Sequence, residues 1–357
     1  MSILPINQEH LESTKIAYTP RNLKLESVTS LLHGEEVIPN VGDLLLAKVT
    51  RIGQHSALEL ANGRRSALFV DDEIIVCYGN RYAPDQYEAR VPTNLGACDL
   101  VASGGVASVM NHRHANIKVP TAIQPIGILA DGENRRINLI DTALPKIASL
   151  FSRPYIVGVV GTSMNAGKTT TAATLIRGLS GAGYAVGAAK VTGTGSGRDT
   201  WLMTDAGSKL TLDFTHAGYP STYLITSEQV DGILETLVTH LSAARVDIVV
   251  MEVADGLFQR ETAALLNSRV FAKMVDSIIF AAGDAMGAVT GVELLERKKL
   301  PIVAISGRLT ASPLAALETA DATGLPVLDK AALSSSSIVD MLQIPRKGTK
   351  TKIQSAG

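Results

Sequence analysis

Aromatic residues, cysteine and surplus charge are all scarce in this chain of 357 residues. Phe, Trp and Tyr together make up 4% of it, so any hydrophobic core must be mainly aliphatic. The two cysteines, Cys77 and Cys98, lie far apart, which disfavours a secreted disulfide scaffold and a zinc site built on cysteine. We expect both to be reduced thiols.

The chain also lacks a basic surplus, a membrane span and a secretory signal. Its formal net charge is -1, so no basic field is available to hold a polyanion, and we expect no nucleic-acid partner. No stretch approaches the ~20 apolar residues of a membrane span. Residues 1–14 have neither the basic nor the apolar region of a signal peptide. We therefore expect no membrane association and a cytoplasmic location.

Residues 1–150 have the texture of a β-rich domain. Short apolar runs at 44–50, 57–60, 66–70 and 73–78 are separated by turn residues, and Asn62-Gly63 is the preferred pair for a tight hairpin. Several short strands punctuated by turns predict a small barrel or sandwich. We expect this domain to complete a substrate site or to form the contact of a homo-oligomer.

Residues 151–340 alternate between apolar strands and longer helical stretches. Strands are predicted at 155–160, 185–190, 248–253, 277–282, 302–306 and 326–328, and helices at 169–180, 228–244, 259–274, 288–298 and 313–323. This alternation predicts an α/β fold with a doubly wound, mostly parallel sheet, as in P-loop NTPases. Residues 341–357 are basic and polar towards their end and are predicted to be a flexible tail.

The strongest motif is the loop GTSMNAGKTT, which follows a buried strand and opens a helix. Backbone amides of such a loop converge on phosphate oxygens, and Gly167 lets the backbone come close. Lys168 supplies a charge between the β- and γ-phosphates, and the Thr169 hydroxyl can ligate Mg²⁺. The predicted nucleotide-binding residues are Gly161, Asn165, Ala166, Gly167, Lys168, Thr169 and Thr170.

Five residues separate Gly161 from Gly167, whereas the common pattern has four. With Gly-Thr at its start, the loop resembles that of dethiobiotin synthetase and of the cobyrinate and cobyrate amide synthetases. It also resembles a P-loop family of unknown function, some members of which are linked to D-amino-acid N-acylation. The resemblance covers about residues 154–330. It implies ATP, or alternatively GTP, as the nucleotide, together with Mg²⁺.

A second segment, from Gly187 to Asp199, runs from a strand into a Gly-rich loop. The resemblance implies that Lys190, with Thr192 beside it, binds an acidic substrate near the γ-phosphate and acts in catalysis. It also implies Asp199 as a loosely matching Mg²⁺ ligand, with Asp205 as its rival. The stretch from Gly197 to Trp201 resembles the molybdopterin guanine dinucleotide accessory protein, whose loop has the shorter spacing.

A third segment is an apolar strand that ends in Glu252, where an acid is expected to face Mg²⁺ or its water shell. The resembled synthetases have glycine at the next position, whereas this chain has Val253. Asp255 is a further candidate for the substrate site. His216 lies in a polar loop that we expect to wall the substrate pocket.

Three functions are compatible with these motifs. The first is an Mg²⁺-assisted, ATP-dependent ligase that activates the carboxylate of a small molecule, such as an amino acid, by phosphoryl transfer. The second is a nucleotide-switched GTPase or accessory protein. The third is an N-acyltransferase that uses acyl-CoA on an amino acid.

Overall fold

The computed structural model describes residues 1–147 and 151–344. The chain divides into two compact units. Unit 1 comprises Met1–Lys146 together with two later segments, Thr192–Trp201 and Asp213–Ile233. Unit 2 comprises Ile147–Val191, Leu202–Leu212 and Leu234–Gly357. The sequence suggests one boundary near residue 150, but the chain passes between the units several times, because the segments that follow Val191 and Leu212 cluster with unit 1.

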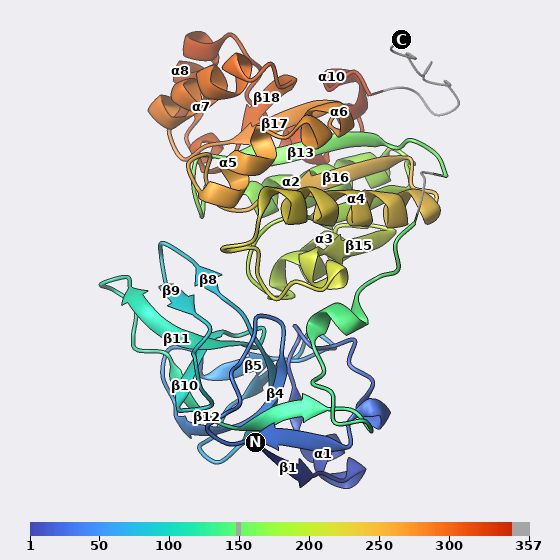
Figure 1. The fold of residues 1–357 in the computed structure, drawn as a ribbon. Coiled ribbons are helices and arrows are strands. Elements are labelled where there is room, and N and C mark those ends of the chain that lie inside the picture. Colours follow the sequence, from blue (N-terminus) through green and yellow to red (C-terminus); the bar gives the residue numbers. More distant parts are fainter. Residues whose placement is uncertain (148–150, 345–357) are drawn as a thin grey trace. The chain divides into compact units, whose positions relative to one another are not determined.

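Unit 1 is built from short strands, as expected, and Figure 1 shows them in blue to blue-green. Its short helix α1 is Gln8–Ser13, and the 3₁₀ turns η1 and η2 are Leu25–Ser27 and Leu139–Thr142. Its strands are β1 (Ser2–Pro5), β2 (Lys15–Ile16), β3 (Ser30–His33), β4 (Leu44–Arg51), β5 (Ala57–Glu59), β6 (Arg65–Ala67), β7 (Glu73–Tyr78), β8 (Arg81–Tyr82), β9 (Tyr87–Arg90), β10 (Cys98–Ala102), β11 (Val106–Arg113) and β12 (Thr121–Ala130).

Five of these strands close into a small barrel. Strand β12 pairs with β4, β4 with β7, β7 with β11, β11 with β10, and β10 again with β12. Successive residues of a strand point to opposite faces. In β7, Ile74 and Val76 therefore join one buried cluster, whereas Ile75 and Cys77 join a second one with Leu11. The expected hairpin at Asn62-Gly63 is present, with β5 and β6 antiparallel around it.

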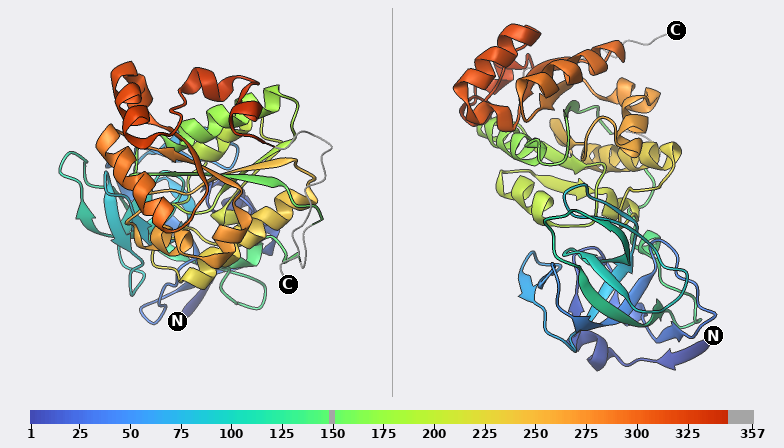
Figure 2. Two further views of the ribbon diagram at one scale, coloured as in Figure 1. Left: turned by 90° about the horizontal axis from the view of Figure 1, so that it is seen from above. Right: turned by 90° about the vertical axis from the view of Figure 1, so that its left-hand side faces the viewer.

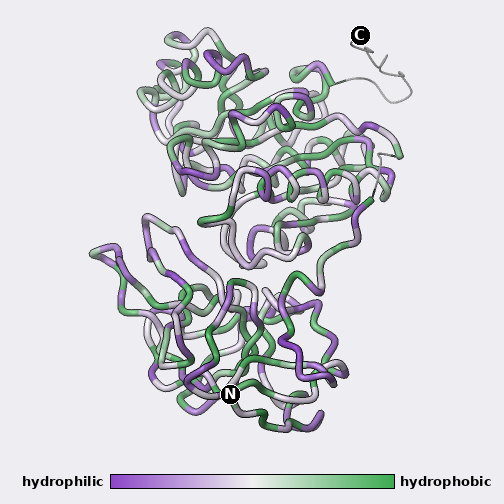
Figure 3. Tube along the Cα trace, viewed as in Figure 1, coloured by the Kyte–Doolittle hydropathy of each residue, from purple (hydrophilic) through white to green (hydrophobic). Residues whose placement is uncertain are grey.

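Unit 2 contains a six-stranded sheet in the order β15-β14-β16-β13-β17-β18. Its strands are β13 (Tyr155–Gly161), β14 (Val186–Lys190), β15 (Leu210–Asp213), β16 (Ile248–Glu252), β17 (Ser277–Ala281) and β18 (Ile302–Ser306). All pairings from β14 to β18 are parallel. Figure 3 shows hydrophobic stretches along this sheet. The α/β fold with a mostly parallel sheet is thus confirmed, as is the β-rich region that precedes it.

Helices cover both faces of this sheet. The α-helices are α2 (Lys168–Gly181), α3 (Arg198–Asp205), α4 (Ser227–Ala243), α5 (Arg260–Leu266), α6 (Arg269–Met274), α7 (Ala285–Arg297), α8 (Pro313–Thr323), α9 (Lys330–Ser334) and α10 (Ile338–Met341), with 3₁₀ turns η3 (Phe214–Ala217) and η4 (Arg308–Ala311). One face is covered by α2, α9 and α10 and the other by α4 (Figure 2). Helices α3 and α4 and strand β15 each cross a boundary between the units.

Several predicted elements differ from the structure. The helix expected over 259–274 is two helices, because Ser268 caps α6 with its side chain and interrupts the first. Residues 326–328 form a single bridge, Val327 to Ile305, instead of a strand. Strand β15 was not predicted, since its sequence reads as part of a polar loop. The predicted tail begins within α10, and its residues 345–357 lie outside the described part of the chain.

Candidate phosphate-binding site

Three parallel strands bring the predicted motifs to one edge of the sheet in unit 2. In register, Val159 of β13 lies opposite Glu252 of β16, and Glu252 lies opposite Lys190 of β14. Neighbouring strands are ~4.8 Å apart, so Lys190 and Glu252 stand side by side on the same face. The carboxyl ends of parallel strands are where ligands bind in α/β folds. Strand β13 enters the Gly161–Thr170 loop at this edge.

The loop has the backbone conformation that a phosphate cradle requires. Asn165 and Gly167 both have positive φ angles, 65° and 102°, and Gly167 is the residue that caps α2. A left-handed residue directly before a helix turns successive N–H groups towards one point, which makes a concave anion site. The N-terminus of α2 adds its partial positive charge. The turn that the sequence predicts therefore has the backbone geometry of an anion site, and phosphate binding by it stays a prediction.

Lys168 is held over this turn. Its side chain is only 5% exposed, and its Nζ donates a hydrogen bond to the Ser163 carbonyl at 2.7 Å. A buried ammonium is costly unless its donors are satisfied. The bond to Ser163 curls the side chain back along the loop, which keeps its charge beside the backbone amides. Nothing in the sequence indicated Ser163 as its partner.

Thr169 and Glu252 form the second polar contact of the site. The Thr169 hydroxyl donates to Glu252 Oε1 at 2.9 Å. Thr169 is half-buried and Glu252 is 2% exposed, so the carboxylate lies beneath the first turn of α2. A Ser/Thr hydroxyl and a strand-end acid are the two protein groups that hold Mg²⁺ in P-loop NTPases. This pair fits that ion, because Mg²⁺ takes few protein oxygens and keeps waters and substrate phosphates as its other ligands.

Glycines that follow β16 and β18 pack directly on the loop. A Cβ on Gly307 would lie 2.5 Å from the Ala166 carbonyl, and one on Gly256 would lie 2.3 Å from the Thr162 carbonyl. The amide after Gly307, that of Arg308, donates to the same Ala166 carbonyl at 2.9 Å. These two glycines fix the loop from either side. Sequence reasoning missed them, because a glycine after a strand signals only a turn until its neighbour in space is known.

The remaining predicted residues divide between the units. Asp255 belongs to unit 2, has a φ of 63° and is half-buried in the loop after β16. Thr192, Asp199 and His216 belong to unit 1. Thr192 is buried, whereas Asp199 is half-buried in the first turn of α3. Their roles in binding substrate or metal stay predictions.

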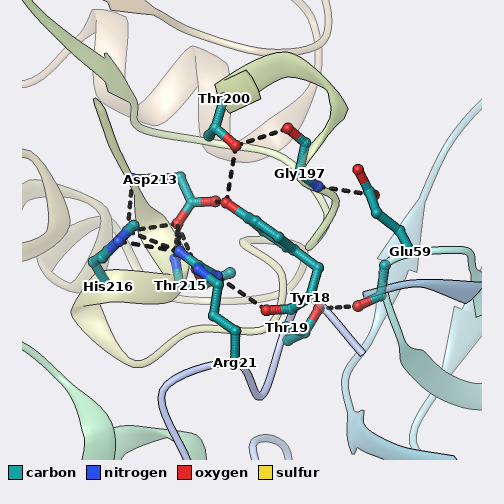
Figure 4. Close-up of polar contacts among 10 residues, drawn as sticks. Tyr18, Thr19, Arg21, Glu59, Gly197, Thr200, Asp213, Thr215 and His216 are labelled. Carbon is teal, nitrogen blue, oxygen red and sulfur yellow. Dashed lines mark hydrogen bonds and ion pairs between the residues drawn. The ribbon is translucent and has the colours of Figure 1, made fainter. Parts of the chain in front are cut away.

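His216 takes part in a buried polar cluster in unit 1 (Figure 4). Its Nδ1 lies 2.9 Å from Asp213 Oδ1, and Arg21 Nη2 lies 3.1 Å from its ring. Asp213 also accepts a hydrogen bond from the Tyr18 hydroxyl at 2.8 Å. Burial alone would raise the pKa of Asp213, but the bond to His216 and the charge of Arg21 outweigh it and hold this pKa well below its usual value. The sequence predicts that the loop containing His216 lines a substrate pocket. In the structure the His216 ring contacts Asp213 and Arg21.

The described residues contain neither a metal-ligating cluster nor a membrane-spanning helix. Across 1–147 and 151–344, no three His, Cys, Asp or Glu side chains gather as they would around a metal ion. No helix in that same part of the chain combines the length and hydropathy needed to cross a membrane.

The fold and the loop together define a P-loop nucleotide-binding unit, and comparison with known proteins agrees with this class. Residues 156–262 match the family model described as molybdopterin guanine dinucleotide synthesis protein B. No curated protein matches the chain. The resemblance to dethiobiotin synthetase-like enzymes stays a prediction.

Solved structures with a similar fold include three distant ones. The signal recognition particle 54 kDa protein of Aeropyrum pernix K1, in complex with GDP, is 20% identical over 57% of this chain and 49% of that one, with a TM-score of 0.37. A DUF1611 family protein from Anabaena variabilis is 16% identical over 56% and 62%, with a TM-score of 0.40. The cell division protein FtsY of Thermotoga maritima is 16% identical over 57% and 74%, with a TM-score of 0.37. This chain thus spans about half the length of the first protein.

Proposed function

We propose that this protein binds a nucleoside triphosphate with Mg²⁺ at the Gly161–Thr170 loop and transfers its γ-phosphoryl group to the carboxylate of a small molecule. ATP is the first candidate nucleotide and GTP the second. The observation that carries the proposal is the 2.9 Å hydrogen bond between Thr169 and Glu252, which joins the hydroxyl and the acid of an Mg²⁺ site directly below the phosphate cradle.

The chemistry follows from positions and charges. The loop amides and Lys168 bind the terminal phosphates and offset charge that spreads over the transferring group. Lys190, 8% exposed at the end of β14, binds the acceptor carboxylate. An oxygen of that carboxylate attacks the γ-phosphorus while the bond to the leaving diphosphate oxygen breaks, giving an acyl phosphate and a nucleoside diphosphate. An amine then displaces phosphate from the acyl group and forms an amide. Mg²⁺, when bound by Thr169 and Glu252, supplies further charge neutralisation.

The buried charges near this edge favour an anionic ligand. Lys168 and Lys190 are both less than 10% exposed, at 5% and 8%, and Glu252 is 2% exposed. Two ammonium groups and one carboxylate at the carboxyl end of parallel strands would suit a polyphosphate held together with Mg²⁺.

The test is binding followed by turnover. Differential scanning fluorimetry with ATP, GTP and acetyl-CoA, each with and without Mg²⁺, identifies the ligand class. We expect a Mg²⁺-nucleotide to raise the melting temperature and Lys168→Ala to abolish that rise. Lys209→Ala is the control, because Lys209 is an exposed cation of unit 2 whose Nζ donates to the Ala244 carbonyl. Stabilisation by acetyl-CoA with no response to nucleotides would instead indicate the acyltransferase alternative.

Phosphate release is then measured with candidate amino acids and other carboxylates. We expect an acceptor to accelerate release, and Lys190→Ala to lose that acceleration while keeping the thermal shift with nucleotide. A Lys190→Ala variant that responds to acceptor like the wild type would contradict the role given to Lys190. Full turnover by Lys168→Ala would contradict the proposed function as a whole.

A second candidate is a nucleotide-switched accessory protein. The match of residues 156–262 to the model of molybdopterin guanine dinucleotide synthesis protein B favours it. This candidate predicts tight binding of GTP over ATP and slow hydrolysis that no small carboxylate accelerates. The fluorimetry and phosphate-release measurements therefore decide between the two candidates.

A further inference from the structure

The residues that follow β18 pack directly against the start of α2. The Cα of Gly307 lies 3.0 Å from the position that a Cβ on Gly167 would occupy, and the Arg308 amide nitrogen lies 3.1 Å from it. The same Arg308 amide donates a hydrogen bond to the Ala166 carbonyl at 2.9 Å. Because Ala166 and Gly167 are predicted nucleotide-binding residues, the backbone of Arg308 contacts the phosphate loop itself.

Further contacts hold this segment at both ends. On one side, the Thr171 hydroxyl in the first turn of α2 donates to Ser306 Oγ at 3.4 Å, and both side chains are buried. On the other side, Leu309 is 2% exposed, and its amide donates to the Ala282 carbonyl at 3.1 Å, directly after β17. All of these residues belong to unit 2. The backbone of Arg308 therefore has a position relative to the loop that contacts within this unit determine.

The side chain of Arg308, in contrast, is exposed. It makes no hydrogen bond or ion pair with any other residue in the described part of the chain. A guanidinium stays charged at every physiological pH, and its planar fork of N–H donors matches the oxygens of a phosphate group. The donors of Arg308 are therefore available to an anion that is bound in the neighbouring loop.

The order of the strands gives the loop two distinct sides. Strand β13, which leads into the loop, lies between β16 and β17. Glu252 and Lys190 end β16 and β14 on one side, whereas Arg308 follows β18 on the other. In the proposed function, the metal-binding acid and the acceptor-binding lysine require the γ-phosphoryl group to face β16. The rest of a nucleotide held in the loop then extends towards β17 and β18.

We propose that Arg308 binds the phosphates of the diphosphate that leaves in the transfer reaction. The inference rests on the proposed function and adds a cation to the same site. When the bond from the γ-phosphorus to the bridging oxygen breaks, its electron pair stays on the leaving diphosphate as negative charge. The guanidinium of Arg308 offsets this charge on the side of the loop opposite to Glu252.

The first test is isothermal titration calorimetry of the full chain with ADP, GDP and inorganic tripolyphosphate, each with Mg²⁺. We expect Arg308→Ala to raise the Kd of tripolyphosphate, and of whichever nucleoside diphosphate the wild type binds, by about 10-fold, because a hydrogen bond between charged groups is lost. Tripolyphosphate has no base, so a change in its affinity reports on phosphate contacts alone.

Arg177→Ala is the matched control. Arg177 is an exposed arginine of α2 whose side chain likewise makes no hydrogen bond or ion pair with other described residues. It lies roughly 13 Å along the helix axis from Lys168. The variant removes the same charge from unit 2, and we expect each Kd to stay within about twofold of the wild-type value. Arg308→Lys keeps the charge without the fork, so its Kd values should be intermediate.

Turnover gives a second measurement. With an acceptor that accelerates phosphate release, kcat of Arg308→Ala should fall about 10-fold, because less of the charge on the leaving diphosphate is offset. The melting temperature without ligand should stay the same, since the Arg308 side chain is exposed. If Arg308→Ala does not fold, Arg308→Gln, which keeps most of the aliphatic side chain, is judged by the same criteria.

Three results would overturn the inference. One is an unchanged Kd for both tripolyphosphate and nucleoside diphosphate in Arg308→Ala. The second is a loss of affinity for the nucleotide without a loss for tripolyphosphate, which would assign the guanidinium to the nucleoside instead. The third is an equal loss in Arg177→Ala, which would show that any exposed cation of unit 2 has this effect. The proposed function fails separately if the wild type shows no Mg²⁺-nucleotide binding that depends on Lys168, and the inference then falls with it.

Discussion

Replacing Thr169 by valine tests the Mg²⁺ site most directly. Valine has nearly the shape of threonine but lacks the hydroxyl that donates to Glu252 Oε1 at 2.9 Å. A hydrogen bond to a charged group contributes ~1.5–3 kcal/mol to stability. Thr169 is half-buried, so we take the lower end, about 1.5–2 kcal/mol. For a domain of roughly 150–250 residues this corresponds to a melting temperature lower by about 3–8 °C.

The thermal shift caused by the nucleotide tests the Mg²⁺ site more directly than the stability of the free protein does. A ligand present at 100 times its Kd stabilises the protein by about 2.7 kcal/mol. In the wild type we expect a larger thermal shift with ATP and Mg²⁺ than with ATP and a chelator. In Thr169→Val only the shift seen with chelator should remain, because the loop amides still bind phosphate while one metal ligand is gone. Thr169→Ser should behave like the wild type.

Thr174→Val is the control for this measurement. Thr174 lies on the same helix, and its hydroxyl donates to the Thr170 carbonyl at 2.7 Å. The variant loses a hydroxyl of the same kind without affecting Glu252. A Thr169→Val protein that keeps the whole Mg²⁺-dependent shift would refute the assignment of this pair to the metal.

Two other predictions concern unit 1. The bond from His216 and the charge of Arg21 hold the pKa of Asp213 below its unfolded value despite burial. This group therefore contributes stability at neutral pH that is lost as pH falls below about 4, and urea unfolding followed from pH 7 to pH 3 should show the loss. The Arg21→Gln variant should unfold at a lower urea concentration than the wild type at every pH, and its stability should decrease less on acidification. Burial raises the pKa of the Cys77 thiol well above its usual value and that of Cys98 to about 12. A disulfide reagent should therefore react with neither thiol in the native protein and with both in urea. Rapid labelling of either cysteine in the native protein would contradict their burial.

The phosphate loop was predictable from the sequence because its information is local. The turn, the glycine that precedes the helix, and the lysine and threonine that open it are contiguous, and their backbone preferences determine the geometry. The strands were predictable for the same reason, since a parallel strand buried on both faces is a continuous apolar run. Strand β15 was not predicted, because Leu210–Asp213 is short and is followed by polar residues.

Whether Lys190 and Glu252 lie beside each other at one edge of the sheet depends on the order of its strands. Each residue ends an apolar strand in sequence, but only the register of β13, β16 and β14 makes them neighbours. The sequence also gave no sign that Gly256 and Gly307 press on the loop. Their contacts are with the backbone of residues distant in sequence, which leaves no periodic pattern.

By itself, the sequence determined an aliphatic α/β unit with a phosphate cradle, preceded by a β-rich region. Those features follow from local backbone preference and from the spacing of apolar residues. Only the tertiary structure decided that Thr192–Trp201 and Asp213–Ile233 pack with the N-terminal residues, and that Tyr18 meets Asp213 across 195 positions of sequence. Such a contact depends on which buried donor finds which buried acceptor once the chain is compact, and no local preference specifies that choice.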